Sequence, residues 1–286
     1  MIWLIGNKGM LGSDVEALLQ KKSSEYIASD KEVDICDIEQ LRRFAGDKKI
    51  SWIVNCSAYT AVDKAEDETE AAFRINGDGV KNIALIAIEK KAKLIHISTD
   101  YVFDGTKNGP YCETDKTNPA GAYGKSKLKG EEYIRETISE YFIIRTAWLY
   151  GKNGNNFVYT MLKLFKERDE VRIVQDQWGS PTYSPDLANA ILKIISDDSN
   201  KFGIYNFTND GKTNWYEFAS EIYKLALKNN ILQKQLKLTP ITTAEYPTKA
   251  KRPSNSYLSK DKIKEELSVE CRDWKAALND FIKDLA

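Results

Sequence analysis

The sequence predicts an α/β fold in which helices cover both faces of a parallel, doubly wound sheet. Three features of roughly the first half of the chain support this prediction: short apolar runs of strand length, helical segments between them, and polar or glycine-rich stretches directly after them. Strands and helices in strict alternation form a parallel sheet, because each helix returns the chain to the edge where the previous strand began. We therefore expect a ligand at the carboxyl ends of the strands.

The first element is an apolar run at residues 2–5, which is long enough for a buried strand and too short for a helix. Gly6, Gly9 and Gly12 follow it, and apolar residues at helical spacing come next. Such a turn lets the backbone approach a pyrophosphate, and the helix N-terminus supplies free N–H groups. The spacing is G-x-x-G-x-x-G, whereas the dehydrogenase pattern is G-x-G-x-x-G, and an ordinary tight turn is the alternative interpretation.

The second strand is predicted at residues 26–30 and ends in Asp30. Asp30 lies 18 residues after Gly12, close to the spacing of about 20 at which an acid meets the adenosine ribose of a dinucleotide. A carboxylate accepts hydrogen bonds from both ribose hydroxyls and repels a 2′-phosphate, which favours NAD, but Lys31 partly offsets that repulsion. The choice between NADH and NADPH stays open, and a solvated loop carboxylate is the alternative interpretation.

The alternation continues along the chain. Further strands are predicted at residues 52–56, 94–98 and 142–145, with a long helix at 71–90 and a helix that contains Tyr123 between the last two strands. Polar stretches at residues 55–60 and 98–100 stand at strand ends, as do the glycine turn and Asp30. Because the carboxyl ends of parallel strands meet at one edge of a sheet, all four features are expected to lie together.

A smaller lobe is predicted after residue 150, where a polar loop at 151–156 leads into shorter elements joined by Pro- and Gly-bearing turns. Residues 184–195 and 204–207 have the pattern of a further helix and strand of the main sheet. We expect a dinucleotide-binding domain at residues 1–150, extended by about 182–207. Residues 151–181 and 208–286 are expected to form an α/β lobe that closes over the ligand edge.

Composition argues against several classes of protein. Lys plus Arg and Asp plus Glu number 42 each, and no block of like charge predicts binding to nucleic acid or an anionic membrane. We expect neither a signal peptide nor a membrane span, because no apolar run approaches about 18 residues. Four scattered cysteines predict reduced thiols in the cytoplasm. The single histidine, His96, is interpreted as a packed strand residue, which leaves little basis for a Ser-His-Asp hydrolase.

Tyr123 and Lys127 stand four positions apart and therefore share one helix face. A free phenol has a pKa of about 10, and a nearby ammonium lowers it, so that the phenol can exchange a proton with a developing alkoxide near neutral pH. The pattern alone is weak, because many helices carry Tyr and Lys on solvated faces. A pyrophosphate turn, Asp30 and Thr99 at a strand end together favour a ketone-reducing site.

Three motifs resemble the extended short-chain dehydrogenases/reductases, which have a Rossmann sheet: the Gly6–Gly12 turn, the STDYVFDG stretch at 98–105, and Tyr123 with Lys127. Five further stretches are similar to the dTDP-4-dehydrorhamnose reductase family, namely residues 60–66, 145–148, 154–157, 176–182 and 252–256. The similarity runs nearly from end to end, and several of these motifs are specific to that family.

The resemblance implies reduction of the C4 ketone of dTDP-4-dehydro-β-L-rhamnose to dTDP-L-rhamnose by NADPH or NADH. It implies that Tyr123 donates the proton to O4, that Lys127 holds the nicotinamide ribose and lowers the pKa of Tyr123, and that Thr99 bonds the reacting oxygen. It implies further cofactor contacts from Gly6, Gly9, Met10, Leu11, Asp30, Asp34, Ile35, Ala58, Tyr59, Thr60 and Ile97. The dTDP-sugar would contact Thr99, Asp100, Trp148, Asn156, Arg252 and Asn255.

The chain departs from the family at two places. Some members form a homodimer linked by Mg²⁺ through clustered carboxylates. The matching positions here are Asp14, with a shortened side chain, and Pro185 followed by Asp186, which argues against the metal and leaves monomer or homodimer open. Position 97 is Ile where the family can have Tyr, so a contact there is apolar or through the backbone.

Two other functions remain as alternatives. A related sugar-nucleotide dehydratase or epimerase would recycle a bound NAD, but a dehydratase requires a Glu beside Asp100, where this chain has Tyr101. A non-catalytic regulatory subunit that binds NADP would retain the fold, yet Thr99, Tyr123 and Lys127 show no sign of a disabled site. The exact 4-keto-6-deoxy sugar also stays open, because loop geometry determines the stereochemistry that is recognised.

Overall fold

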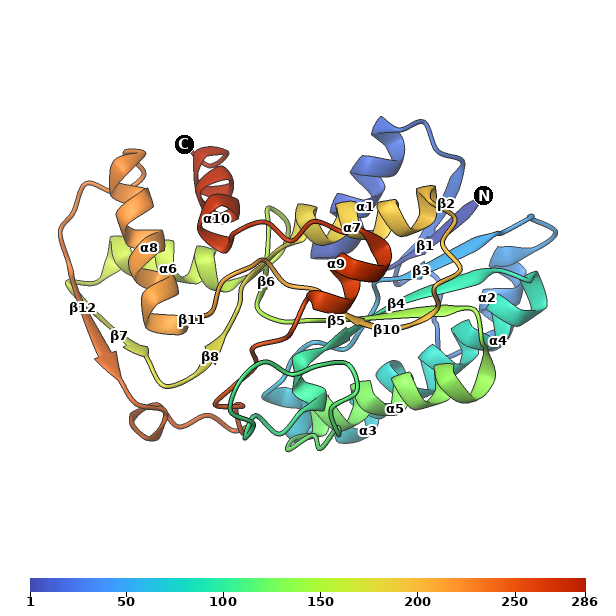
Figure 1. Ribbon diagram of the computed structural model, residues 1–286, viewed down its shortest axis with the longest axis horizontal. Helices are drawn as coiled ribbons and strands as arrows, with labels where there is room; N and C mark the ends of the chain where they lie inside the picture. Colours follow the sequence, from blue (N-terminus) through green and yellow to red (C-terminus); the bar gives the residue numbers. More distant parts are fainter.

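The computed structural model describes residues 1–286. Its central feature is a six-stranded sheet with the order β10-β5-β4-β3-β1-β2, in which every neighbouring pair is parallel (Figure 1). The strands are β1 (Ile2–Ile5), β2 (Tyr26–Ser29), β3 (Trp52–Asn55), β4 (Lys93–Thr99), β5 (Tyr141–Thr146) and β10 (Gly203–Asn206). The predicted α/β fold with a doubly wound parallel sheet is confirmed. Strand order reverses between β1 and β3, where such sheets bind ligands.

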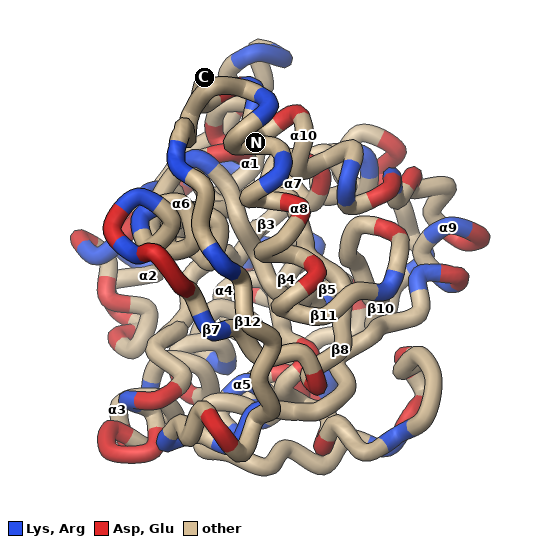
Figure 2. Tube along the Cα trace, turned by 90° about the vertical axis from the view of Figure 1, so that its left-hand side faces the viewer, with Lys and Arg blue, Asp and Glu red and all other residues tan.

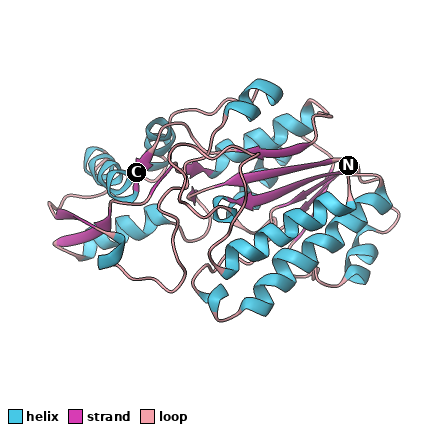
Figure 3. Cartoon of the chain, turned by 60° about the horizontal axis from the view of Figure 1, so that its bottom comes forward, coloured by secondary structure: helices cyan, strands magenta, loops and turns pink.

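Helices cover both faces of the sheet (Figure 3). One face packs against α1 (Met10–Lys21), α7 (Ser184–Ser196) and α9 (Asp261–Leu267). The other face packs against α2 (Ile38–Ala45), α4 (Val80–Lys90) and α5 (Ala122–Thr137), with the short α3 (Thr69–Phe73) beside α5. Both sides of the central strands are therefore buried, which explains why these strands are short apolar runs without alternation.

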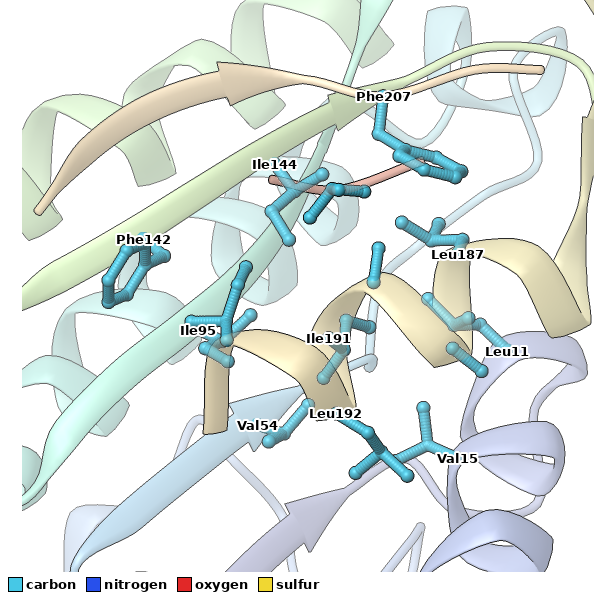
Figure 4. Close-up of a cluster of buried hydrophobic side chains, with 14 of the residues drawn as sticks. Leu11, Val15, Val54, Ile95, Phe142, Ile144, Leu187, Ile191, Leu192 and Phe207 are labelled. Carbon is cyan, nitrogen blue, oxygen red and sulfur yellow. The ribbon is translucent and has the colours of Figure 1, made fainter. Parts of the chain in front are cut away.

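The core on the α1 and α7 face shows how sequence pattern becomes packing (Figure 4). Helical residues three and four apart supply one wall, and inward residues of neighbouring strands supply the other. The labelled members are Leu11, Val15, Val54, Ile95, Phe142, Ile144, Leu187, Ile191, Leu192 and Phe207, each at most 5 % exposed. Burying a side chain of this size contributes about 1.5–3 kcal/mol, so this layer fixes α1 and its N-terminus firmly on the sheet.

A second lobe lies at the opposite end of the molecule from the N-terminus (Figure 1). Its larger elements are α6 (Phe157–Glu167), α8 (Trp215–Lys228), α10 (Trp274–Lys283) and the parallel pair β7 (Glu170–Val174) and β12 (Lys237–Ile241). Short strands connect the lobes: β6 (Leu149–Tyr150), β8 (Trp178–Gly179), β9 (Thr182–Tyr183) and β11 (Thr213–Asn214). This lobe has its own aromatic-rich core, which includes Tyr150, Phe165, Phe218, Trp274 and Phe281.

Two elements differ from the sequence expectation. The sequence pattern assigns residues 208–286 wholly to the smaller lobe, but Ile263 and Leu267 of α9 pack into the sheet core, because they are apolar and lie one turn apart. The helix expected at 71–90 contains a wider π-type turn at Arg74–Gly79, which separates α3 from α4. Such turns often occur at functional sites, and this one carries the buried Asn76 toward the ligand edge.

The surface charge is mixed, as the composition predicts. Lys and Arg lie interspersed with Asp and Glu along the whole trace (Figure 2). Many of these residues form exposed ion pairs, such as Arg42 with Glu89, which contribute little to stability. None of the helices has both the length and the apolar character that crossing a bilayer requires.

Candidate active site

The glycine turn joins β1 to α1 at the point where strand order reverses. Gly6 has a φ of +81°, which favours glycine, and a Cβ atom on Gly12 would lie 2.0 Å from the carbonyl oxygen of Gly6. Helix α1 can therefore start directly against the turn only because position 12 has no side chain. Gly9 precedes α1 without a side-chain cap, so the N–H groups of the first turn are free for an anion.

A cleft of about 1090 Å³ runs along the carboxyl ends of the strands, and we call it the sheet-edge cleft. It brings together most of the residues that the sequence predicts for the cofactor and the chemistry. They are Gly6, Gly9, Met10, Leu11, Asp30, Asp34, Ile35, Ala58, Thr60, Ile97, Thr99, Asp100, Tyr123, Lys127 and Trp148. Residues far apart in sequence thus meet because six parallel strands end at one edge.

A second cleft of about 690 Å³ lies mainly in the smaller lobe, and we call it the second-lobe cleft. Phe157, Trp215 and Tyr246 give it an aromatic lining, and arginines are present beside them. Tyr101 and Trp148 line both clefts, so the two spaces adjoin. The Trp148 backbone has a φ of +50°, which is rare for a bulky residue, and its ring stacks on Trp215 with centroids 3.7 Å apart.

Thr99 and Asp100 stand at the end of β4 and are both buried. The Thr99 hydroxyl donates to Asp100 Oδ1 at 2.9 Å and accepts from the Tyr101 N–H at 3.2 Å. The other carboxylate oxygen of Asp100, Oδ2, is buried without a partner. Burial raises the pKa of Asp100 to about 6, while the hydroxyls of Thr99 and Ser256 oppose the shift. Asp100 lines the sheet-edge cleft, so this buried oxygen is left for the nearby Ser256 hydroxyl or a ligand hydroxyl to bond.

Tyr123 lies in the first turn of α5, and a close approach to the loop after β4 fixes that turn. A Cβ atom on Gly124 would lie 2.2 Å from the carbonyl oxygen of Tyr101, and the Tyr101 and Tyr123 rings make an edge contact at 5.5 Å. Burial raises the pKa of Tyr123 above its ordinary value; the Thr99 hydroxyl opposes this shift, and the charge of Asp100 adds to it. The phenol therefore holds its proton at neutral pH.

Lys127 does not lower the pKa of Tyr123 in this structure, contrary to the sequence expectation. Its ammonium nitrogen donates to the Ile97 carbonyl oxygen at 2.7 Å and lies 3.3 Å from Nε2 of His96. Burial lowers the pKa of Lys127 itself to about 8. The helix-face argument predicts proximity along α5, but the long lysine side chain turns to polar groups of β4 instead.

Two residues predicted to bind the substrate make structural hydrogen bonds instead of lining a cleft. Asn156 accepts from the Tyr159 N–H at the start of α6 and donates to Gly151 O. Asn255 donates to the carbonyl oxygens of Lys107 and Gly109, so both asparagine side chains hold loops together and line neither cleft.

Tyr59 and Arg252 make other contacts. Tyr59 is outside the lining of both clefts, and its hydroxyl donates to Glu68 at 2.6 Å. Arg252 lines the second-lobe cleft, where it donates to Asp63 and to the Tyr101 hydroxyl.

Three residues at the site have no counterpart among the predicted ones. Tyr101 lines both clefts. Asn76 bonds both backbone groups of Tyr59 and the hydroxyl of Ser126, and so holds the loop after β3. His96 contacts Lys127 instead of only packing in its strand. The polar contact of His96 could have been expected from strand pairing, since His96 lies opposite the polar Asn55 on the neighbouring strand.

The positions that match metal ligands in some relatives do not fit Mg²⁺. Asp186 accepts from Arg272 and Asn209 through its carboxylate. Asp14 has one buried oxygen without a partner, and burial raises the pKa of its carboxyl. The structure contains no group of three His, Cys, Asp or Glu side chains that could hold a metal ion.

Together, the fold and the site define a protein of the short-chain dehydrogenase/reductase class, with a dinucleotide turn and a Thr–Tyr–Lys constellation in one cleft. The family described as the RmlD substrate binding domain matches residues 1–286, and the chain belongs to this family.

Known relatives agree over nearly the whole length. A dTDP-4-dehydrorhamnose reductase of Aggregatibacter actinomycetemcomitans is 41% identical over 284 residues, which cover 97% of each chain. The crystal structure of a dTDP-4-dehydrorhamnose reductase from Clostridium acetobutylicum has a TM-score of 0.93 and 41% identity over 99% of both chains. That from Bacillus anthracis, in complex with NADP, has a TM-score of 0.93 and 36% identity over 99% of this chain and 98% of that one. The resemblance inferred from the motifs is confirmed.

Proposed function

We propose that this chain reduces the C4 ketone of dTDP-4-dehydro-β-L-rhamnose to dTDP-L-rhamnose, with NADPH or NADH as the reductant. One observation carries the proposal: Thr99, Tyr123 and Lys127 line the same cleft as the glycine turn. A proton donor and a dinucleotide turn in one cleft are what ketone reduction requires. The relatives named for this activity, which match nearly the whole chain, support the choice of substrate.

The lining of the sheet-edge cleft supports binding of the cofactor there. The free N–H groups at the start of α1 suit the pyrophosphate, and Asp30 stands where a carboxylate meets the adenosine ribose. Lys8 and Lys31 line the same cleft, which suits the additional phosphate of NADPH, and the relative in complex with NADP supports that interpretation. When bound, the cofactor supplies the hydride. Ile97 and Ala58 then offer an apolar and backbone contact to its nicotinamide half.

The sugar nucleotide would occupy the adjoining spaces. The aromatic second-lobe cleft suits a nucleobase, and Arg252 with Arg168 and Arg172 supplies positive charge for a diphosphate. Tyr101 and Trp148, shared by both clefts, would then flank the keto-sugar. In such a complex the ketone would lie near Tyr123, and a sugar hydroxyl would lie near Asp100, whose Oδ2 has no hydrogen-bond partner.

The proposed chemistry assigns one task to each polar group. Tyr123 gives its proton to O4, and its raised pKa ensures that this proton is present throughout the physiological pH range. The Thr99 hydroxyl turns from Asp100 to stabilise the developing charge on O4. Once the cofactor is bound, Lys127 would hold its ribose hydroxyls, and the charge of Lys127 would then stabilise the phenolate that remains. The two lobes exclude water, which strengthens these interactions.

A Tyr123→Phe variant tests the proton donor, because it removes one oxygen and keeps the ring. We expect kcat for NADPH oxidation with dTDP-4-dehydro-L-rhamnose to fall about 10²–10⁴-fold. Tyr133→Phe is the matched control: it lies in the same helix, its ring contacts Lys81 and Lys129, and its activity should stay within twofold. Turnover by Tyr123→Phe within a few-fold of the wild-type value would refute the assignment.

The same assay separates the alternatives. A dehydratase or epimerase recycles its bound NAD and consumes no net NADPH, and a regulatory subunit binds NADP without turnover. Parallel assays with the C3 and C5 epimers of the keto-sugar, each with NADH and NADPH, would identify the preferred pair. We place the reaction in the cytoplasm, a location supported by four free cysteines at Cys36, Cys56, Cys112 and Cys271, and leave the choice between monomer and homodimer open.

A further inference from the structure

The buried imidazole of His96 has a tautomer that its neighbours determine. Asn55 Oδ1 accepts from the Ser57 backbone N–H at 3.0 Å and from the Ser57 hydroxyl at 2.6 Å. Because a backbone N–H can only donate, this contact fixes the orientation of the Asn55 amide. Its Nδ2 group, 3.0 Å from Nδ1 of His96, is therefore the donor. Nδ1 carries no proton, and the neutral ring holds its proton on Nε2.

That proton points at Lys127. Nε2 of His96 lies 3.3 Å from the Lys127 nitrogen, which also donates to Ile97 O at 2.7 Å. An ammonium has three donors and no lone pair, so a charged Lys127 would place one donor against another. A neutral amine accepts the Nε2 proton and still donates to Ile97. The hydrogen-bond pattern thus destabilises the charged form of Lys127 in the free protein relative to the neutral form.

The charges around Lys127 oppose this selection only weakly. Glu131, one turn further along α5, attracts a charged Lys127, but its carboxylate already pairs with Arg145 of β5 and accepts from Ser98. The Cys56 thiol, after β3, has a pKa raised to about 12 by burial and is neutral. Tyr123 keeps its proton, because burial raises its pKa as well. No uncompensated negative charge therefore stabilises an ammonium here.

Burial acts in the same direction as the hydrogen bonds. Lys127 is 1% exposed, and desolvation lowers its pKa to about 8. Desolvation is also the largest cause that lowers the pKa of His96 well below its ordinary value, so the imidazole stays neutral.

We propose that His96 is a positioning residue that favours the neutral amine of Lys127 in the free enzyme, and that at alkaline pH, where this amine predominates, Lys127 takes up one proton from solvent when the ribose hydroxyls of the cofactor replace His96 as its partner. In this step one N–H bond forms at Lys127 Nζ, the proton comes from water or buffer, and His96 keeps its own proton. The inference rests on the proposed role of Lys127 at the nicotinamide ribose. At such pH the positive charge that stabilises a phenolate at Tyr123 would then appear only once reductant is present.

The tautomer can be measured in the wild-type enzyme without any variant. The chain has a single histidine, so ¹⁵N-imidazole labelling gives one pair of ring nitrogen resonances. We expect a protonated Nε2 and an unprotonated Nδ1 throughout pH 6–9, because burial holds the pKa of His96 below this range. A ring protonated at Nδ1, or an imidazolium at pH 7, would overturn the proposal.

Calorimetry of NADPH binding in buffers of different ionisation enthalpy measures the proton uptake. A pKa near 8 in the free enzyme, restored to its ordinary value in the complex, predicts uptake of about 0.1 proton at pH 7 and about 0.9 at pH 9. The dissociation constant should rise about tenfold over the same interval by linkage. Lys127→Met removes the acceptor and should abolish the uptake.

A His96→Gln variant tests the role of the imidazole, because its amide oxygen can accept from an ammonium. We expect uptake at pH 9 to fall at least fivefold and the pH dependence of NADPH binding to flatten. If that variant does not fold, the wild-type and Lys127→Met titrations decide the question. Wild-type enzyme that turns over but binds NADPH at pH 9 without taking up a proton on binding would refute this inference alone, whereas enzyme that binds no NADPH would refute the proposed function.

Discussion

The carboxylate of Glu131 and the guanidinium of Arg145 form a buried bidentate ion pair that ties α5 to β5. The Nε–Oε1 and Nη2–Oε2 distances are 3.0 and 2.6 Å, and both side chains are at most 3% exposed. The Ser98 hydroxyl of β4 donates to the same carboxylate. Helix α5 carries Tyr123 and Lys127, so this pair helps set their distance from the strand ends.

Removing one charge of this pair should be costly. Glu131→Gln leaves the Arg145 guanidinium buried and uncompensated, and we expect the free energy of unfolding in urea to fall by about 3–5 kcal/mol. The neighbouring Glu132 pairs with Lys129 on the surface, with 44% of its side chain exposed. Glu132→Gln should therefore change stability by less than about 0.5 kcal/mol. Equal effects of the two substitutions would show that Glu131 has no special structural role.

Adding a side chain at position 124 should lower catalytic activity more than it lowers the stability of the fold. In Gly124→Ala the new methyl group must move either the start of α5 or the carbonyl of Tyr101, since they would be 2.2 Å apart. Displacing Tyr123 by even a fraction of this distance should lower kcat/KM more than tenfold. Gly77→Ala is the matched control, because its new Cβ would meet Lys129 at an ordinary 3.5 Å. An unchanged kcat/KM for Gly124→Ala would contradict the positioning argument.

The buried charge of Asp100 should destabilise the folded protein and at the same time support activity. Its folded pKa of about 6 exceeds its ordinary value of 3.8, so the native state binds more protons between these values and loses stability as pH rises through them. Asp100→Asn removes the buried charge and should raise the free energy of unfolding at pH 8 by about 1–3 kcal/mol while lowering activity. The gain should vanish near pH 4. An Asp100→Asn variant less stable than wild type at pH 8 would contradict this direction of the effect.

Asp104 provides the opposite case in the same segment. Backbone and hydroxyl donors of Thr106 hold the pKa of Asp104 below its ordinary value. The Asp104 carboxylate therefore stabilises the folded protein above pH 4, and this stabilisation is lost as pH falls further. Asp104→Asn should destabilise the protein at pH 8, and denaturation measured at pH 4 and 8 distinguishes this variant from Asp100→Asn.

Cofactor preference should respond to Asp30. Asp30 lines the sheet-edge cleft, and in the proposed complex its carboxylate would meet the adenosine ribose, where it can accept from the hydroxyls and repels a 2′-phosphate. In Asp30→Ala we expect kcat/KM to fall at least tenfold with NADH and to stay within threefold of wild type, or to rise, with NADPH. Asp47→Ala changes an exposed acid outside both clefts and should leave both constants unaltered. A larger loss with NADPH than with NADH would reverse the assignment.

Local patterns predicted much of this protein, because the physics behind them is local. Each prediction depended on a segment of about a dozen residues or fewer. The apolar run Ile2–Ile5 predicted a strand, the glycines after it predicted the turn at its ligand-binding end, and the Tyr123–Lys127 spacing predicted two side chains on one helix face. The sheet then brings these edges together without further information. Placement of Thr99 and Asp30 in one cleft followed from strand order alone.

The remainder depended on contacts between distant segments. Nothing near Asn255 in sequence indicates that its amide bonds Lys107 and Gly109. The turn of Lys127 toward His96 depends on three elements meeting in the core, and the packing of α9 on the sheet depends on contacts in the same core as Phe207. Periodicity identifies which side chains are apolar, but not which of two cores they join.

The path of the chain between the two cores has a consequence for folding. After β5 the backbone leaves the sheet for the second lobe, returns for α7 and β10, leaves for α8, returns for α9 and leaves again for α10. No single cut separates the lobes into two continuous pieces. Neither half can therefore be expressed as an independent fragment, and heat or urea should unfold the whole molecule in one cooperative transition. The same repeated crossings should restrict any movement of one lobe relative to the other to small concerted shifts.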